Sequence, residues 1–109
     1  MDRAQTSDSG PTFLVERYWP GIDLAALRVA LVRLEAAARE LADEGDHVEH
    51  LGSILMPADQ VVFSLIAAND ESVVRRVNER AGLPIDRIAG AIALLGGPPA
   101  RRSTEGATR

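Results

Sequence analysis

The stretch that most limits the possible folds is VVFSLIAA at residues 61–68. Side chains alternate between the two faces of a strand. In this stretch the odd positions are all apolar, and so are the even positions apart from Ser64. A strand with one face in water would alternate apolar and polar residues instead. Residues 61–68 therefore predict a strand that is covered on both faces.

The N-terminal half predicts a strand followed by a long helix. TFLVERYW at 12–19 is rich in β-branched and aromatic residues and stops at Pro20-Gly21, as strands do before a turn. Asp23 then has the position of an N-cap. From residue 24 to about residue 42 the apolar residues recur at intervals of three and four, which predicts an amphipathic helix.

The middle of the chain predicts an antiparallel hairpin. HVEHLGSILM at 47–56 alternates loosely between apolar and polar residues, which is typical of a strand. It is joined to the dense apolar run at 61–68 by the short polar connection Pro57-Ala58-Asp59-Gln60. Two strands joined by so short a link are expected to pair with each other.

A second helix and a last strand follow. Asn69 or Asp70 is the expected N-cap of this helix, and Gly82 is its expected end. The run RIAGAIALL at 87–95 fits a helix or a strand by its spacing. Its short length, its internal glycine and the need to complete a sheet favour a strand.

The resulting order, β-α-β-β-α-β, predicts an α+β protein with the ferredoxin-like fold. This fold has an antiparallel sheet with two helices on one face. We expect one domain over residues 12–95, with disordered polar tails at 1–11 and 96–109. The strands at 61–68 and 88–95 are apolar on both sides, which is unusual for an exposed sheet. A second copy of the chain could cover the free face, so we predict a homodimer of the dimeric α/β-barrel type.

Composition excludes several classes of function. The net charge of −4 and the isoelectric point near 5.1 argue against a nucleic-acid partner, which would need a basic face. The chain has no cysteine, so disulfides, thiolate metal ligands and a cysteine nucleophile are excluded. No apolar run approaches the length of a membrane span, and we expect a soluble cytoplasmic protein with no membrane partner.

Both histidines lie near the start of the 47–56 strand, with the spacing His-x-x-His. In a flat strand His47 and His50 point to opposite faces, so they cannot share one metal ion. Alternation groups His50 with Ile54 and Met56 on the face toward the helices, and His47 with Glu49 and Ser53 on the other. The candidate metal ligands are therefore His47 with Glu49, and His50 separately. The alternatives are a half-buried structural His50 and a solvated strand entry at His47.

The first strand supplies a second group of candidates. Alternation places Glu16 and Tyr18 on the face that a dimer would enclose, and we expect Ser64 nearby as a third ligand-binding residue. The alternative is a structural ion pair between Glu16 and a local arginine. No set of nucleophile, base and orienting residue and no phosphate loop is recognisable from local spacing, so no catalytic residue is assigned.

Three segments of the chain resemble a known family. They are FLVERYWPG at 13–21, VEHLGSILMPADQVVFSL at 48–65 and ERAGLPIDRI at 79–88. They resemble small bacterial proteins of otherwise unknown function, among which an actinobacterial member binds nickel. The resemblance implies a ferredoxin-like fold, a dimer and Ni²⁺ as a possible cofactor.

This chain departs from that family at possible ligand positions. Relatives often carry cysteine around residues 62–64 and histidine near the positions of Arg17 or Asn78. Since nickel favours nitrogen and sulfur donors, the departure predicts weak or absent metal binding.

Three functions are compatible with the sequence. The resemblance favours a small dimeric protein that binds a metal ion or another small ligand. The first alternative is a cofactor-free dimeric-barrel enzyme, of the monooxygenase or isomerase type, with Tyr18, Glu16 or a histidine as the acid–base group. The second alternative is a structural or regulatory interaction module.

Overall fold

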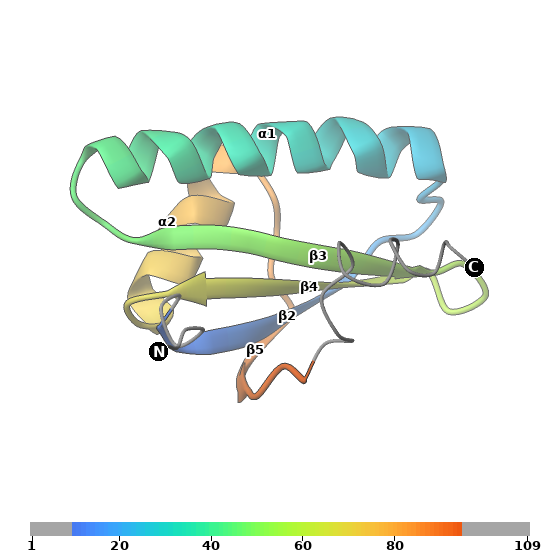
Figure 1. Cartoon of the computed structure of the whole chain (residues 1–109). Coiled ribbons are helices and arrows are strands. Elements are labelled where there is room, and N and C mark those ends of the chain that lie inside the picture. The colour runs from blue at the N-terminus through green and yellow to red at the C-terminus, as the bar shows by residue number, and fades with distance from the viewer. Residues whose placement is uncertain (1–9, 95–109) are drawn as a thin grey trace, which may run out of the picture.

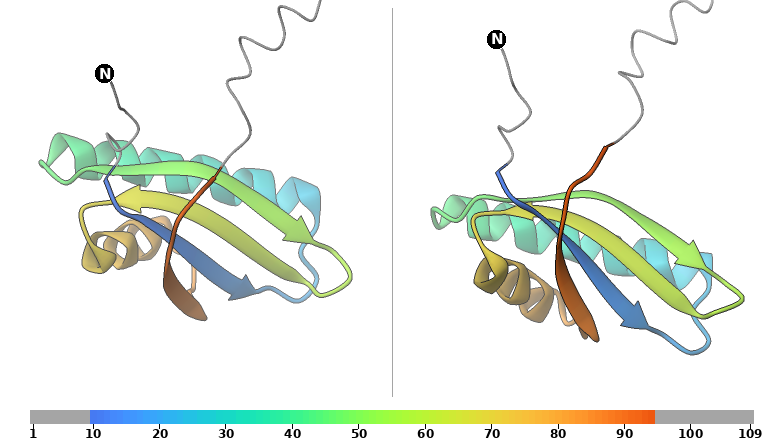
Figure 2. Two further views of the ribbon diagram at one scale, coloured as in Figure 1. Left: turned by 60° about the horizontal axis from the view of Figure 1, so that its bottom comes forward. Right: turned by 90° about the horizontal axis from the view of Figure 1, so that it is seen from below.

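The computed structural model describes residues 10–94 and shows a four-stranded antiparallel sheet with both helices on one face (Figures 1 and 2). The strands are stacked in the order β3-β4-β2-β5, and each neighbouring pair is antiparallel. This is the ferredoxin-like arrangement that the sequence predicted. In chain order the elements are β2 (Thr12–Tyr18), α1 (Leu24–Asp43), β3 (Val48–Met56), β4 (Val61–Ala68), α2 (Glu71–Ala81) and β5 (Arg87–Ala91).

The helices begin at the capping residues that the sequence predicted. The Asp23 carboxylate accepts a hydrogen bond from the Ala26 amide at 2.8 Å, and α1 starts one residue after this cap. Asp70 caps α2 in the same way. Gly82 ends α2 with φ of 74°, the left-handed conformation that side chains with a Cβ rarely adopt.

The core lies between the helices and one side of the sheet, which we call the helix face. The even positions of β4 point into it and are buried, together with Val15 of β2. The opposite side, the open face, carries the odd positions of β4 and their neighbours on β2 and β3, and no helix of the described chain covers it (Figure 2). The largest apolar side chains that are fully buried are Val15, Leu34, Leu41, Val62, Ile66, Val74 and Val77.

A β-bulge in β3 reverses the alternation that the sequence suggested. The register with β4 shifts between His50 and Gly52, so Leu51 is an extra residue on β3. Beyond a bulge each side chain changes face. Ser53 therefore lies opposite Ser64 on the helix face, and Ile54 is 59% exposed on the open face. The prediction that Ile54 and Met56 face the helices with His50, and that Ser53 does not, was wrong for this reason.

The last strand is shorter than predicted. β5 ends at Ala91, where Ala91 pairs with Thr12, the first residue of β2. Pro11 precedes Thr12 and has no amide hydrogen to continue the ladder. Residues 92–94 consequently lie outside the sheet. Residue 95, the predicted tail at 96–109 and all but the last two residues of the predicted tail at 1–11 are outside the described residues. Within residues 10–94, neither helix combines the length and apolar character that a membrane span requires.

We predict that Gly82→Ala lowers the free energy of unfolding by roughly 1 kcal/mol, because alanine is strained at positive φ. Gly90→Ala is the matched control, since the added methyl group meets nothing within 4 Å and the backbone there has no positive φ. Urea unfolding followed by circular dichroism measures both. Equal stability of the two variants would contradict the assigned helix end.

Candidate functional site

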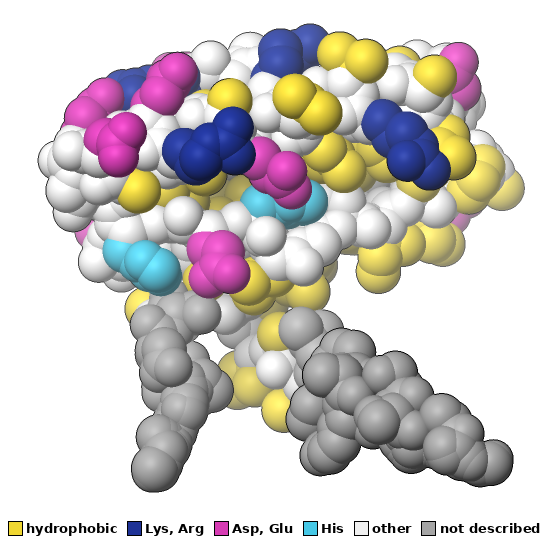
Figure 3. All heavy atoms as spheres, turned by 45° about the horizontal axis from the view of Figure 1, so that its top comes forward, with side chains coloured by type: hydrophobic (Ala, Val, Ile, Leu, Met, Phe, Trp, Pro, Cys, Tyr) yellow, Lys and Arg dark blue, Asp and Glu magenta, His cyan; other side chains and the backbone are white. Residues whose placement is uncertain are grey.

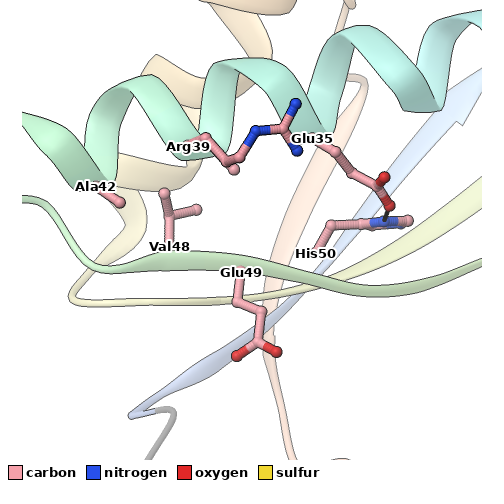
Figure 4. A pocket seen from close by; sticks show the side chains of 7 residues that line it. Glu35, Arg39, Ala42, Val48, Glu49 and His50 are labelled. Carbon is pink, nitrogen blue, oxygen red and sulfur yellow. Dashed lines mark hydrogen bonds and ion pairs between the residues drawn. The ribbon is translucent and has the colours of Figure 1, made fainter.

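A groove runs between α1 and the neighbouring edge strand β3. Its volume is about 250 Å³. Figure 4 shows Glu35 and His50 pointing toward each other across it, whereas Glu49 points away from α1. Figure 3 shows acidic and basic side chains interspersed with hydrophobic ones over this side of the molecule. The groove is lined by Glu35, Ala38, Arg39 and Ala42 of α1 and by Val48, Glu49 and His50 of β3.

His50 is held by polar contacts at both ring nitrogens. Its Nδ1 lies 3.1 Å from Oε2 of Glu35, and its Nε2 lies 2.8 Å from Oγ of Ser53. The imidazole is 7% exposed, while the Glu35 side chain is 52% exposed. His50 therefore lies on the helix face, as the alternation predicted, and is a buried histidine whose carboxylate partner reaches solvent.

The contacts continue from His50 into the core. Oγ of Ser53 lies 2.7 Å from Oγ of Ser64, and Nη2 of Arg17 lies 3.4 Å from Oγ of Ser64. These five side chains, from Glu35 through His50, Ser53 and Ser64 to Arg17, form one continuous row that we call the polar chain. It connects the solvent-facing groove to the centre of the protein.

Arg17 forms the inner end of the polar chain and is 1% exposed. Its Nη1 donates to Oδ1 of Asn78 at 2.7 Å and to the Pro84 carbonyl at 2.9 Å. Asn78 is itself fully buried and donates to the Val74 carbonyl, which orients its amide. Burial lowers the pKa of Arg17 to about 10, an effect that the charge of Asp86 partly offsets. The guanidinium is still protonated at neutral pH.

The sequence reasoning did not identify Arg17, Asn78 or Glu35 as members of a site. Alternation did place Arg17 on the helix face beside Val15, which is a signal for a buried cation in need of partners. Asn78 follows the buried Val77 on α2 and is the polar residue within reach of that cation. Glu35 offered no such signal, because the exposed side of α1 carries several charged residues.

The predicted group of Glu16, Tyr18 and Ser64 is not assembled. Glu16 lies opposite Phe63 on the open face, and Tyr18 is on the same face and 56% exposed. Ser64 lies opposite Val15 on the helix face, so its prediction as a neighbour of Glu16 and Tyr18 was wrong. Glu16 lies 3.7 Å from Arg87 of β5, which is the ion pair considered as the alternative.

The two histidines do not meet. His47 precedes β3 and is exposed, and its amide donates to Oδ1 of Asn69. Glu49 lies opposite Ala67 on the open face, while His50 lies on the helix face. His47 precedes this register, so the prediction that the two histidines point to different sides stays a prediction. Residues 10–94 contain no group of three or more histidine, aspartate or glutamate side chains that could hold a metal ion.

The described residues of one chain thus bring one imidazole and one carboxylate together, and not a complete set of metal ligands. The pair, an imidazole and a carboxylate, has the nitrogen and oxygen chemistry that Ni²⁺ accepts. The described core does not offer a second position for a metal ion, because the buried guanidinium of Arg17 repels a cation beside Ser64 and Asn78. Those are the positions around which relatives were expected to carry histidine or cysteine.

The order and pairing of the elements place the chain among small ferredoxin-like α+β proteins. Over residues 13–90 the chain matches the family described as SCO4226-like, nickel responsive protein SCO4226-like, and it belongs to this family. The crystal structure of SCO4226 from Streptomyces coelicolor A3(2) is similar in fold, with a TM-score of 0.66 and 24% sequence identity. The alignment covers 77% of this chain and 99% of that one. No curated protein gives a significant match.

We predict that Arg17→Met lowers the free energy of unfolding by about 2 kcal/mol, because it leaves the Asn78 amide and the Pro84 carbonyl buried without their donor. Arg28→Met on the exposed side of α1 is the matched control. Chemical denaturation of both variants measures the difference. An Arg17→Met protein as stable as Arg28→Met would show that the buried contacts contribute nothing.

Proposed function

We propose that this protein is a homodimeric, metal-responsive binding protein whose first metal donors are Glu35 and His50. The contact between the two side chains at 3.1 Å, in a member of a family described as nickel responsive, carries the proposal. The carboxylate is half exposed and the imidazole faces it from a rigid strand, so an ion in the groove reaches both donors. The other coordination positions are left to water or to a second copy of the chain.

The other two functional classes have less support in the structure. An acid–base enzyme that works inside a dimer would use Glu16 or Tyr18, but Glu16 is engaged with Arg87 and Tyr18 is exposed in the single chain. In a purely structural module the contacts of His50 with Glu35 and Ser53 would only support packing. The description of the family as nickel responsive favours a binding protein instead.

We expect weak binding of Ni²⁺ by calorimetric titration, because imidazole and carboxylate are the available donors and one chain supplies two of them. His50→Gln and Glu35→Gln should each weaken binding by about tenfold or more. His47→Gln is the matched control and should bind like the unmodified protein. Equal losses from His47→Gln and His50→Gln would contradict this assignment of the donors.

The dimer is proposed on the basis of the open face. This face has an apolar hollow of about 240 Å³. Exposed apolar side chains of this extent are unusual on a monomer, and a sheet-to-sheet contact with a second copy would cover them. The hollow is lined by Leu14, Leu51, Gly52, Ser53, Ile54, Phe63 and Leu65.

We predict that sedimentation at micromolar concentration gives about twice the chain mass of 11.7 kDa. Ile54→Glu should yield a folded monomer, because it places a charge in the apolar hollow that the second copy would cover. Val32→Glu is the control, since Val32 is 67% exposed on α1, away from the open face. A monomeric unmodified protein, or dissociation caused by Val32→Glu instead, would refute the sheet-to-sheet contact.

A further inference from the structure

We infer that the polar chain locks His50 in the tautomer with its proton on Nδ1, and that Arg17, Ser64 and Ser53 act as positioning residues that hold it there. The tautomer follows from the direction in which each group of the polar chain can donate its hydrogen bond. Its consequence for metal binding rests on the proposed function, but the tautomer itself does not.

The direction is set at the inner end by Arg17. A guanidinium has donors and no acceptor, so Oγ of Ser64 must accept from Arg17. Ser64 is fully buried, and its own hydroxyl proton needs an acceptor inside the protein. Oγ of Ser53 at 2.7 Å provides that acceptor.

The same direction continues to the groove. Ser53 accepts from Ser64, so its own proton is directed to Nε2 of His50 at 2.8 Å. Nε2 must then be the unprotonated nitrogen of a neutral imidazole, and Nδ1 carries the proton. Nδ1–H donates to Oε2 of Glu35 at 3.1 Å, and an ionised carboxylate is an acceptor alone.

The two ends of the polar chain therefore require the same direction of hydrogen-bond donation. Every member between them accepts one hydrogen bond from the Arg17 side and donates one toward Glu35. The opposite tautomer would place the lone pair of Nδ1 against the carboxylate of Glu35. It would also make Ser64 accept from both Arg17 and Ser53, so the buried Ser64 proton would lose Ser53 as its acceptor. Both ends of the polar chain would then be unfavourable.

This direction of hydrogen-bond donation adds a barrier to metal binding. An ion held by Glu35 and His50 needs the lone pair of Nδ1, so the proton must leave Nδ1 while one is taken up at Nε2 through solvent. The charge of the ring is unchanged, but Nε2–H now donates to Ser53, and both hydroxyl groups must turn around. The buried cation thus opposes loading of the groove without touching it.

The tautomer is measured by two-bond ¹H–¹⁵N correlation spectra of the metal-free protein at about pH 8.5, where an ordinary imidazole is neutral. We expect His50 to show the Nδ1–H pattern, with the exposed His47 as the internal reference. An Nε2–H pattern at His50 would overturn the inference. Glu35→Gln should retain the Nδ1–H pattern, and the double variant Glu35→Gln/Ser64→Ala should lose it. Loss of the Nδ1–H pattern in Glu35→Gln alone would show that Arg17 does not help to select the tautomer.

Nickel titration tests the consequence separately. Ser64→Ala frees Ser53 to accept from Nε2–H, so it should tighten nickel binding by roughly fivefold, the equivalent of one hydrogen bond. Ser53→Ala is the matched control and should not tighten binding, because it removes the acceptor that Nε2–H needs. Weaker binding in Ser64→Ala, with folding verified by circular dichroism, would overturn the proposed barrier. Absence of nickel binding in every variant would refute the proposed function, and the tautomer spectra would still decide this inference.

Discussion

The structure depends on how a single buried guanidinium finds its hydrogen-bond partners. Arg17 lies near the C-terminal end of β2, which is an interior strand of the sheet. Its contacts reach Ser64 of β4, Asn78 of α2 and the carbonyl of Pro84 before β5. These contacts join elements that lie far apart along the chain. Because an unpaired buried cation is costly, the position of α2 and the entry to β5 are tied to the position of the central strand.

The same interaction links the interior to the groove. A core filled with apolar side chains would leave His50 to be oriented by Glu35 alone. Here the buried charge orders two serine hydroxyls, and the hydroxyl of Ser53 in turn contacts the imidazole. The groove therefore contains an imidazole–carboxylate pair that is connected to the core through two serine hydroxyls. Stability and binding are expected to be coupled in this protein for that reason.

The two faces of the sheet have an unusual distribution of polarity. The helix face, which is buried, contains Arg17, Ser64 and His50 among its apolar residues. The open face has an apolar hollow lined by Leu14, Phe63 and their neighbours. Glu16 and Glu49 lie on the same face, but the hollow itself is apolar, which is unusual for a sheet surface in water. The distribution supports a second layer over the open face, which is the basis of the proposed dimer.

Much of this architecture was determined by the local sequence. The element order, the caps at Asp23, Asp70 and Gly82, and the buried side of α2 follow from periodicity and from backbone chemistry within a few residues. The polar chain was decided by the tertiary structure. The bulge at Leu51 depends on how β3 pairs with β4, and it moves Ser53 to the helix face and Ile54 to the open face. Arg17 meets Asn78 across 61 residues, and Glu35 meets His50 across 15. Local sequence patterns determine whether a segment is a helix or a strand and where it ends. Contacts between residues that are distant in sequence are determined by packing and by the hydrogen bonds that a buried charge requires.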